Sequence, residues 1–223
     1  YFTSFTDPNV QIADDDAEML EGVLSTEHEG GKILFIINSP GGQALAAERI
    51  VNVCRAYSEG EAFEVLVPHM AKSAATMICF GAAVIRMSKT AELGPVDPQI
   101  PYGDMEKPMW ISAEEYLRSY DNLMEQASNG KAKRIEPFLQ QLNRFDARYI
   151  EQLRSVQRLS EDISVRLLGS SMMSGSSDSQ IKKAIEPFLS QRKKAAHGRM
   201  INHREAQACN LKIELVELRS PEW

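Results

Sequence analysis

The chain has 223 residues, 43% of them hydrophobic, so it can bury a substantial core in one large domain or two small ones. Its net charge of −6 and pI of about 5.4 argue against a nucleic-acid binder, because such proteins usually present a basic surface. The three cysteines are far apart, and neither they nor the four histidines show a metal-binding spacing. We therefore expect free, buried thiols, no metal and no cofactor.

The first third of the chain alternates strand and helix patterns. Residues 32–38 are apolar and β-branched and predict a buried strand, whereas residues 44–60 carry apolar side chains on one helical face. Further along, residues 63–68 predict a strand, 71–83 a helix of small buried residues, and 84–88 a third strand. Strands that alternate with helices imply parallel pairing in one sheet. The pattern therefore predicts an α/β fold.

The second half changes character. We expect long polar helices over residues 112–194, with apolar residues at helical spacing in 134–168 and a flexible Ser/Gly-rich linker at 169–179. A short helix and a final strand close the chain, and we expect that strand to return to the core sheet. The resulting prediction is a single domain over 1–223, with 112–194 as a helical insertion and 195–223 as a returning helix–strand unit.

Two short motifs are candidates for chemistry. Gly41 and Gly42 follow the first strand in "NSPGG", which lacks the phosphate-loop and dinucleotide patterns. The loop is either a tight turn or a source of N–H groups for an oxyanion. Ser73 starts the small-residue helix and is either an N-cap or a nucleophile. Because both motifs follow parallel strands, they should meet at the carboxyl edge of the sheet.

Three segments carry a resemblance to a known family. In this order, "LFIINSPGG", "AKSAATMICFGA" and "ELGPVDPQI" resemble the Clp protease proteolytic subunit and signal peptide peptidase A superfamily. They are most similar to its serine dehydrogenase proteinase branch, which is a Clp-like serine protease. The segments "YFTSF…IADDDAEML" and "HGRMINHREAQACNLKIELVEL" also resemble that branch. The resemblance thus covers about residues 1–101 and 195–218.

The resemblance implies a ClpP/crotonase-like fold of repeated ββα units, here with a long helical insertion in the second half. It implies that Ser73 is the nucleophile. It also implies that Gly41, Gly42 and the N–H of Ala74 form the oxyanion hole. Members of this superfamily act on peptides or proteins and usually assemble into homo-oligomers, so the same is expected of this chain.

The general base departs from the family pattern. Clp proteases carry a histidine after the nucleophile helix, where "ELGPVDPQI" offers Asp97, and an aspartate near the end, where "KKAAHGRMI" offers His197. We therefore expect a Ser73–His197–Asp97 triad with the two residue types exchanged, since triads recur in several chain orders. A Ser–Lys dyad, as in signal peptide peptidase A, stays open, with Lys131 and Lys133 as candidates.

The expected function is a serine peptidase. Two alternatives remain: a crotonase-like acyl-CoA enzyme, which shares the fold, and a non-catalytic oligomeric scaffold, which the missing histidine and the long helical segment favour. No apolar run approaches the roughly 18 residues of a membrane span, and no signal peptide is evident. We expect a cytoplasmic location; because the chain starts at Tyr1 rather than Met, a removed membrane anchor stays open.

Overall fold

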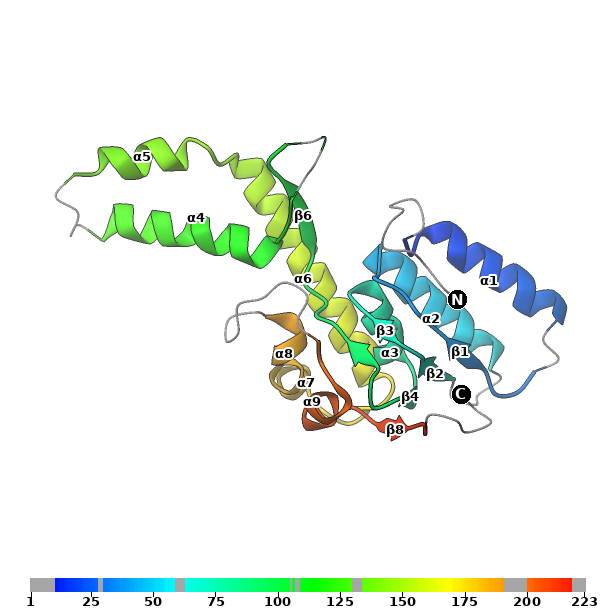
Figure 1. Cartoon of the computed structure of the whole chain (residues 1–223). Helices are drawn as coiled ribbons and strands as arrows, with labels where there is room; N and C mark the ends of the chain where they lie inside the picture. The colour runs from blue at the N-terminus through cyan, green and yellow to red at the C-terminus, as the bar shows by residue number, and fades with distance from the viewer. Residues whose placement is uncertain are drawn as a thin grey trace. The chain divides into compact units, whose positions relative to one another are not determined.

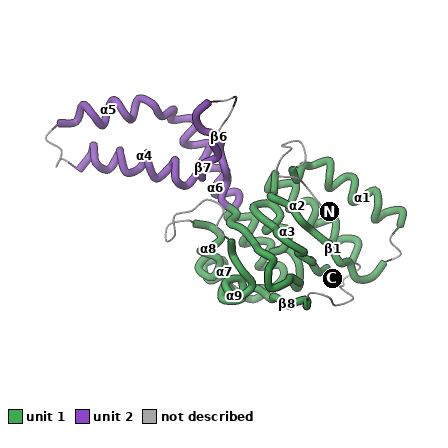
Figure 2. The backbone as a smooth tube through the Cα atoms, in the orientation of Figure 1, with its two compact units in different colours: residues 1–96, 161–223 green, residues 97–160 purple. Residues whose placement is uncertain are grey.

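The structure is a computed structural model. It describes residues 11–27, 30–58, 63–104, 106, 109–129, 134–190 and 200–217. The chain divides into two compact units, drawn in different colours in Figure 2. Unit 1 comprises residues 1–96 and 161–223, and unit 2 comprises residues 97–160. Each unit has its own cluster of buried apolar side chains.

A parallel sheet forms the centre of unit 1 (Figure 1). Its strands, in spatial order, are β1 (Leu34–Ile36), β2 (Glu64–Val67), β4 (Ile85–Met87) and β8 (Ile213–Leu215). All three neighbouring pairs are parallel, so the predicted parallel pairing is confirmed. The pairing of β8 with β4 also confirms that the last strand returns to the core sheet. Strands buried in this way show continuous apolar runs, which explains why the sequence pattern predicts them.

Helices surround this sheet. Those of unit 1 are α1 (Asp14–Glu27), α2 (Ala44–Tyr57), α3 (Ala74–Gly81), the end of α6 (Ala147–Gly169), α7 (Asp178–Ala184), α8 (Glu186–Leu189) and α9 (His203–Ala208). Helix α3 is buried along its whole length, and α2 and α3 lie side by side (Figure 1). A Cβ at Gly81 would lie 2.5 Å from Val51 Cγ1, so only glycine allows this close approach. The predicted helices and the mixed α/β class are confirmed.

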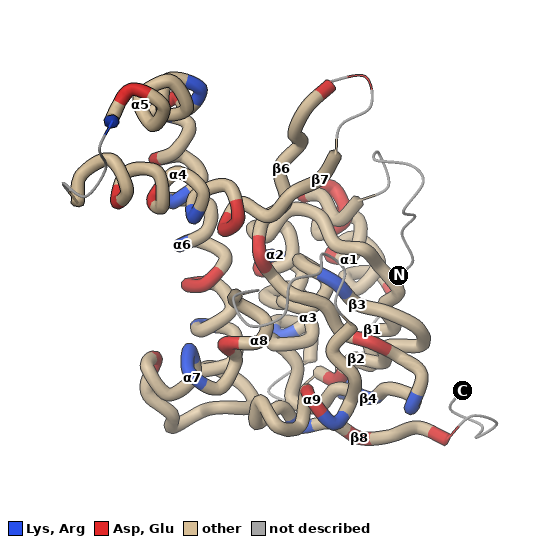
Figure 3. Tube along the Cα trace, turned by 60° about the vertical axis from the view of Figure 1, so that its left-hand side comes forward, with Lys and Arg blue, Asp and Glu red and all other residues tan. Residues whose placement is uncertain are grey.

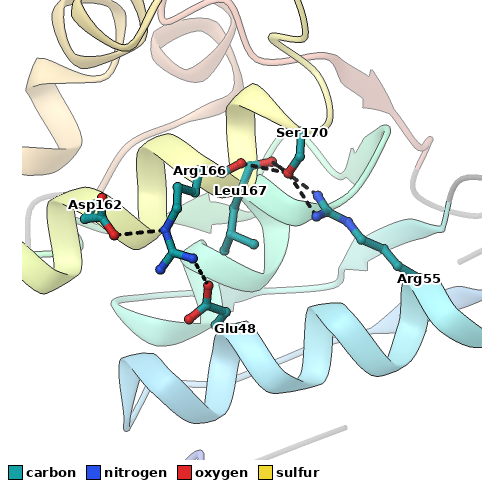
Figure 4. Close-up of polar contacts among 6 residues, drawn as sticks. All are labelled: Glu48, Arg55, Asp162, Arg166, Leu167 and Ser170. Atoms are coloured by element: carbon teal, nitrogen blue, oxygen red, sulfur yellow. Dashed lines mark hydrogen bonds and ion pairs between the residues drawn. The ribbon is translucent and has the colours of Figure 1, made fainter.

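Two arginines connect α2 with the end of α6 (Figure 4). The Arg166 guanidinium forms ion pairs with Glu48 at 2.7 Å and with Asp162 at 2.8 Å. The Arg55 guanidinium donates to the Leu167 carbonyl at 3.2 Å and also to the Gly81 carbonyl at 2.9 Å. Arg55 thereby supplies donors to the carboxyl ends of both α3 and α6, where carbonyl groups lack helical partners.

The connection between α6 and α7 differs from its prediction. Residues 169–179 are rich in serine and glycine, yet Met172 and Met173 are only 8% and 6% exposed and join the main core. The Ser171 hydroxyl donates to the Phe80 carbonyl at 2.6 Å, which fixes the turn against α3. The prediction of a flexible linker is therefore wrong, because two buried methionines hold the segment in place.

Unit 2 combines a hairpin with helices. Its elements are the antiparallel strands β6 (Gln99–Tyr102) and β7 (Met109–Ser112), α4 (Ala113–Ser128), α5 (Glu136–Leu142) and the beginning of α6. The segment 134–168, where we expect apolar residues at helical spacing, contains two helices, because Asp146 Oδ1 accepts from Arg148 N at 2.8 Å at the start of α6. Unit 2 begins and ends earlier than the predicted insertion 112–194, whose last part lies in unit 1.

Charged residues are spread along both units. Figure 3 shows acidic and basic residues interspersed along the described trace. Within the described ranges, no helix combines the length and the apolar character that crossing a membrane requires.

Candidate active site

Ser73 lies at a sharp turn between a strand and a helix of unit 1. Strand β3 (Met70–Ala71) runs parallel to β5 (Glu92–Leu93) and leads into Ser73, directly before α3. The Ser73 backbone has φ 52° and ψ −122°, a conformation that costs a non-glycine residue about 1–3 kcal/mol. Its N–H donates to the Pro95 carbonyl at 3.1 Å. Strained turns of this kind present the nucleophile in several hydrolases.

The Ser73 side chain does not cap the helix. Ser73 occupies the N-cap position of α3, but its hydroxyl makes no capping hydrogen bond. An N-cap serine normally accepts a bond from one of the first helical N–H groups. The residue as a whole is half-buried. The structure therefore does not support the interpretation of Ser73 as a helix cap.

The glycine loop reaches Ser73, as the sequence predicts. Gly41 has φ +113°, and a Cβ there would lie 2.6 Å from the Lys72 carbonyl oxygen and 2.7 Å from Ser73 Cβ. The loop is held in place because Ser39 pairs with Ala71: Ser39 N donates to Met70 O, and Lys72 N donates to Ser39 O, both at 3.1 Å. Only glycine allows the backbone to approach the serine so closely.

The N–H groups of this loop are not equivalent. Gly41 N–H donates to the Ser39 hydroxyl at 3.0 Å, so it is already occupied. Gly42 pairs with Ile12 through neighbouring backbone groups, and its own N–H has no hydrogen-bond partner among the described residues. The same is true of Ala74 N–H, the first of α3. An available N–H directly after a serine, and a second on the loop that contacts this serine, are the usual elements of an oxyanion hole.

Two buried hydroxyl groups support the turn, and sequence reasoning missed both. Ser39 is 0% exposed, and its hydroxyl holds the Gly41 N–H. Thr76 is also 0% exposed, and its Oγ1 lies 2.7 Å from the Ala71 carbonyl and 2.9 Å from the Gly94 carbonyl. Both residues stand inside the quoted motifs, but their partners come from other segments. The only signal for them in the sequence is that both residues lie within these motifs.

The structure describes Asp97 but none of the three candidate general bases. His197, Lys131 and Lys133 lie outside the described residues. Asp97 is the first residue of unit 2; it is 5% exposed and its Oδ2 accepts from Gln99 Nε2 at 3.0 Å. The exchanged triad and the lysine dyad therefore both stay predictions.

The described residues on either side of His197 are attached to the β5 segment. Before it, the Phe188 carbonyl accepts from Val96 N at 2.9 Å. After it, Ile201 and Leu93 exchange two backbone bonds of 2.9 Å each. Both attachments lie on the segment next to β3, which leads to the candidate nucleophile.

Cys54, Cys79 and Cys209 are free and buried, as the sequence predicts. Burial raises the pKa of Cys54 to about 12 and also raises the pKa of Cys79, so both thiols are protonated and unreactive near neutral pH. Among the described residues, no group of three or more His, Cys, Asp or Glu side chains is arranged to hold a metal ion.

Comparison with known proteins identifies the family. The sequence model of a family described as "ClpP-like SDH-type serine proteinase" matches residues 9–127, more than half of the chain. That range contains Gly41, Gly42, Ser73 and Asp97, whereas His197 lies beyond it.

Two curated relatives come from Methanocaldococcus jannaschii, and both are named as uncharacterized proteins. MJ0137 is 36% identical over 104 residues, which are 47% of this chain and 35% of that protein. MJ1495 is 32% identical over 135 residues, which are 58% of this chain and 44% of that protein. The chain therefore spans less than half the length of these relatives. The family match extends over the strained serine and the glycine loop alike, and the chain belongs to the ClpP-like SDH-type serine proteinases.

Proposed function

We propose that the chain is a serine peptidase and that Ser73 is its nucleophile. The observation that carries the proposal is the strained backbone of Ser73, which lies against Gly41. In addition, the Ser73 hydroxyl does not cap α3. A protein maintains such strain only where the surrounding structure holds it, and such positions cluster at active sites. Membership in a serine proteinase family supports the same assignment.

In the proposed mechanism, the groups around Ser73 act one after another. The Ser73 oxygen attacks the carbonyl carbon of a peptide bond while a general base takes the hydroxyl proton. The oxyanion that forms accepts hydrogen bonds from the N–H groups of Gly42 and Ala74. Gly41, whose N–H is occupied, contributes the close approach of the loop instead. The base then protonates the leaving amine, and water hydrolyses the acyl-enzyme.

We assign the general base to His197, with Asp97 as the carboxylate that orients its ring. An imidazole has a pKa close to neutral and suits proton transfer at physiological pH. The family resemblance at "KKAAHGRMI" supports this choice. Lys131 or Lys133 is the alternative base. Lys72 is a weaker candidate, because its Nζ is 2.7 Å from Glu92 Oε1.

Peptide hydrolysis by a matched set of variants tests this proposal. A pool of unstructured peptides is incubated with the wild type and with Ser73→Ala, His197→Gln, Lys131→Gln and Lys133→Gln, and the products are identified by mass spectrometry. Ser73→Ala and His197→Gln should each lose about 10³-fold or more in rate, whereas the lysine variants should stay close to the wild type.

Two outcomes would contradict it. Full activity in His197→Gln together with loss in one lysine variant would replace the triad with a dyad. Equal cleavage by the wild type and Ser73→Ala would remove Ser73 as the nucleophile, and a folded wild type that cleaves no peptide would leave the scaffold.

We also propose that the chain assembles into a homo-oligomer. Unit 2 exposes three large apolar side chains on its hairpin: Tyr102 is 51%, Met109 63% and Trp110 55% exposed. Large apolar side chains that stay exposed can mark protein interfaces. Sedimentation should show an oligomer that Trp110→Glu shifts toward the monomer. A wild-type chain that sediments as a monomer would contradict this part of the proposal.

A further inference from the structure

An ion pair lies directly beside the proposed nucleophile. Lys72 immediately precedes Ser73, and its Nζ is 2.7 Å from Oε1 of Glu92, which belongs to β5. The two side chains are only 22% and 13% exposed. Most ion pairs between charged side chains on a protein surface are far more solvated and contribute little. This pair is therefore not an ordinary surface contact.

The path of the lysine side chain depends on a glycine. A Cβ at Gly94 would lie 2.7 Å from Lys72 Cγ and 2.9 Å from Lys72 Cβ. The lysine stem thus lies across Gly94, and any larger residue there would displace it. Gly94 in turn donates its N–H to the Ala71 carbonyl at 2.9 Å, which fixes β5 against β3. The absence of a side chain at Gly94 therefore allows the Lys72 side chain to reach Glu92.

The same lysine is bonded through its backbone to the other parts of the site. Its N–H donates to the Ser39 carbonyl at 3.1 Å, and its own carbonyl accepts from Ala75 N at 3.0 Å. Lys72 consequently connects the glycine loop, the start of α3 and, through its side chain, β5. All three connections converge on the residue that precedes the strained serine.

Stability alone gives a poor reason for such a pair. Removing two charges from water costs several kcal/mol per ion in general, and well-packed apolar residues often replace buried pairs without loss. A fixed geometry is a better reason, because charged partners in a partly buried setting restrict a segment to one arrangement. The segment here is the one that carries Ser73 in a conformation that residues with a Cβ disfavour.

We propose that the Lys72–Glu92 ion pair positions the nucleophile: it ties the residue before Ser73 to β5 and keeps the Ser73 hydroxyl aligned with the unpaired N–H groups of Gly42 and Ala74. The inference rests on the proposed function of Ser73. In this role Lys72 is one partner of the ion pair and takes no proton from the serine. It is a positioning residue, and Glu92 is its partner.

The rate at which a fluorophosphonate probe labels Ser73 measures this alignment directly. Glu92→Gln and Lys72→Met should lower the maximal labelling rate by about tenfold to a hundredfold, because small displacements of reacting groups are costly. The concentration of probe that gives half the maximal rate should change much less. Each variant is assayed well below its own melting temperature, so that all the protein compared is folded.

A matched control separates positioning from general stability. Glu48→Gln breaks the Arg166–Glu48 ion pair, which has the same 2.7 Å separation and a 19% exposed carboxylate but connects α2 with α6. This variant should label within about twofold of the wild-type rate, whatever happens to its melting temperature. A loss in Glu48→Gln equal to that in Glu92→Gln would overturn the positioning role.

Lys72→Arg separates positioning from proton transfer. Arginine keeps the charge and the pair with Glu92, but it does not give up its proton near neutral pH. The variant should keep at least about a third of the wild-type labelling rate and the same pH profile, whereas Lys72→Met should not. Equal losses in Lys72→Arg and Lys72→Met would make Lys72 the base and overturn the inference.

The positioning role and the nucleophile assignment fail differently. A labelled wild type with an unchanged rate in Glu92→Gln would overturn the positioning role alone. A folded wild type that takes no label at all would overturn the nucleophile assignment, and the positioning role with it.

Discussion

Gly41 is the residue at which the two candidate motifs meet. An added methyl group would contact the Lys72 carbonyl and Ser73 Cβ, and the φ of +113° is itself unfavourable for alanine. Gly41→Ala should therefore lower the free energy of unfolding by about 2–4 kcal/mol, the sum of backbone strain and overpacking. Urea denaturation measures this change.

Gly31 provides the matched control for that substitution. Its φ is +100°, and no atom of the described residues lies within 4 Å of an added Cβ. Gly31→Ala should therefore cost only the conformational part, about 1–2 kcal/mol. If both variants lose the same free energy, the close contact between Gly41 and the serine turn contributes nothing to stability, and this prediction is wrong.

Single residues of the candidate site could be singled out where the motif itself suggests a chemistry. Ser73, Gly41 and Gly42 stand out because a serine among small residues and a glycine pair both follow strands. The different roles of the two glycines were not predictable, since they depend on the Ser39 hydroxyl that occupies Gly41 N–H. The Lys72–Glu92 pair was equally hidden, because its partners are twenty residues apart in the sequence.

At the scale of elements, Arg55 donates hydrogen bonds to carbonyl groups at the ends of α3 and α6. Its guanidinium donates to the Leu167 carbonyl at 3.2 Å and to the Ser170 hydroxyl at 2.9 Å (Figure 4). It also donates to the Gly81 carbonyl at 2.9 Å. Burial lowers the pKa of Arg55, but the group stays charged at neutral pH. Arg55→Met should lower the free energy of unfolding by about 2–3 kcal/mol, because partly buried carbonyls lose charged donors.

Arg166 offers the comparison on the same pair of helices. Its side chain is 53% exposed, and its partners Glu48 and Asp162 are carboxylates rather than helix-end carbonyls. Solvent screens such pairs, so Arg166→Met should cost about 0–1 kcal/mol in the same urea experiment. An equal or larger loss for Arg166→Met would show that ion pairing, and not the satisfaction of helix ends, dominates this junction.

Elements were predictable where one physical signal was dominant. The strands and helices between residues 32 and 88 follow from apolar runs and helical periodicity, and the structure confirms them with narrower bounds. The turn after α6 was not predictable from composition, since serine and glycine suggest a linker while Met172 and Met173 anchor it. No sequence pattern predicted the β6–β7 hairpin either, because Pro101 interrupts the short strand β6 and charged residues separate it from β7 in the sequence.

At the scale of the whole molecule, the buried thiols should lower the free energy of unfolding as the pH rises above 9. The pKa of Cys54 rises from 9.0 to about 12 on burial. Above pH 9 the unfolded chain releases the thiol proton and the folded chain retains it, so the unfolded state binds fewer protons. The free energy of unfolding should therefore fall by up to about 1.4 kcal/mol per pH unit from this group between pH 9 and 12.

A cysteine-to-alanine variant isolates that contribution. Cys54→Ala loses some packing at every pH, but its stability should decline less steeply than that of the wild type above pH 9. Part of the slope should remain, because burial also raises the pKa of Cys79. Urea denaturation from pH 8 to 10.5 provides the curves. Parallel curves for the two proteins would contradict the burial effect at Cys54.

The proposed chemistry depends on Ser73 more than on any other residue. Reaction of the folded wild-type chain with a fluorophosphonate, followed by peptide mapping with mass spectrometry, tests it most directly. We predict one phosphonyl adduct on Ser73 that is absent from Ser73→Ala. No adduct on the folded protein, or an adduct on a different serine that persists in Ser73→Ala, would contradict the assignment.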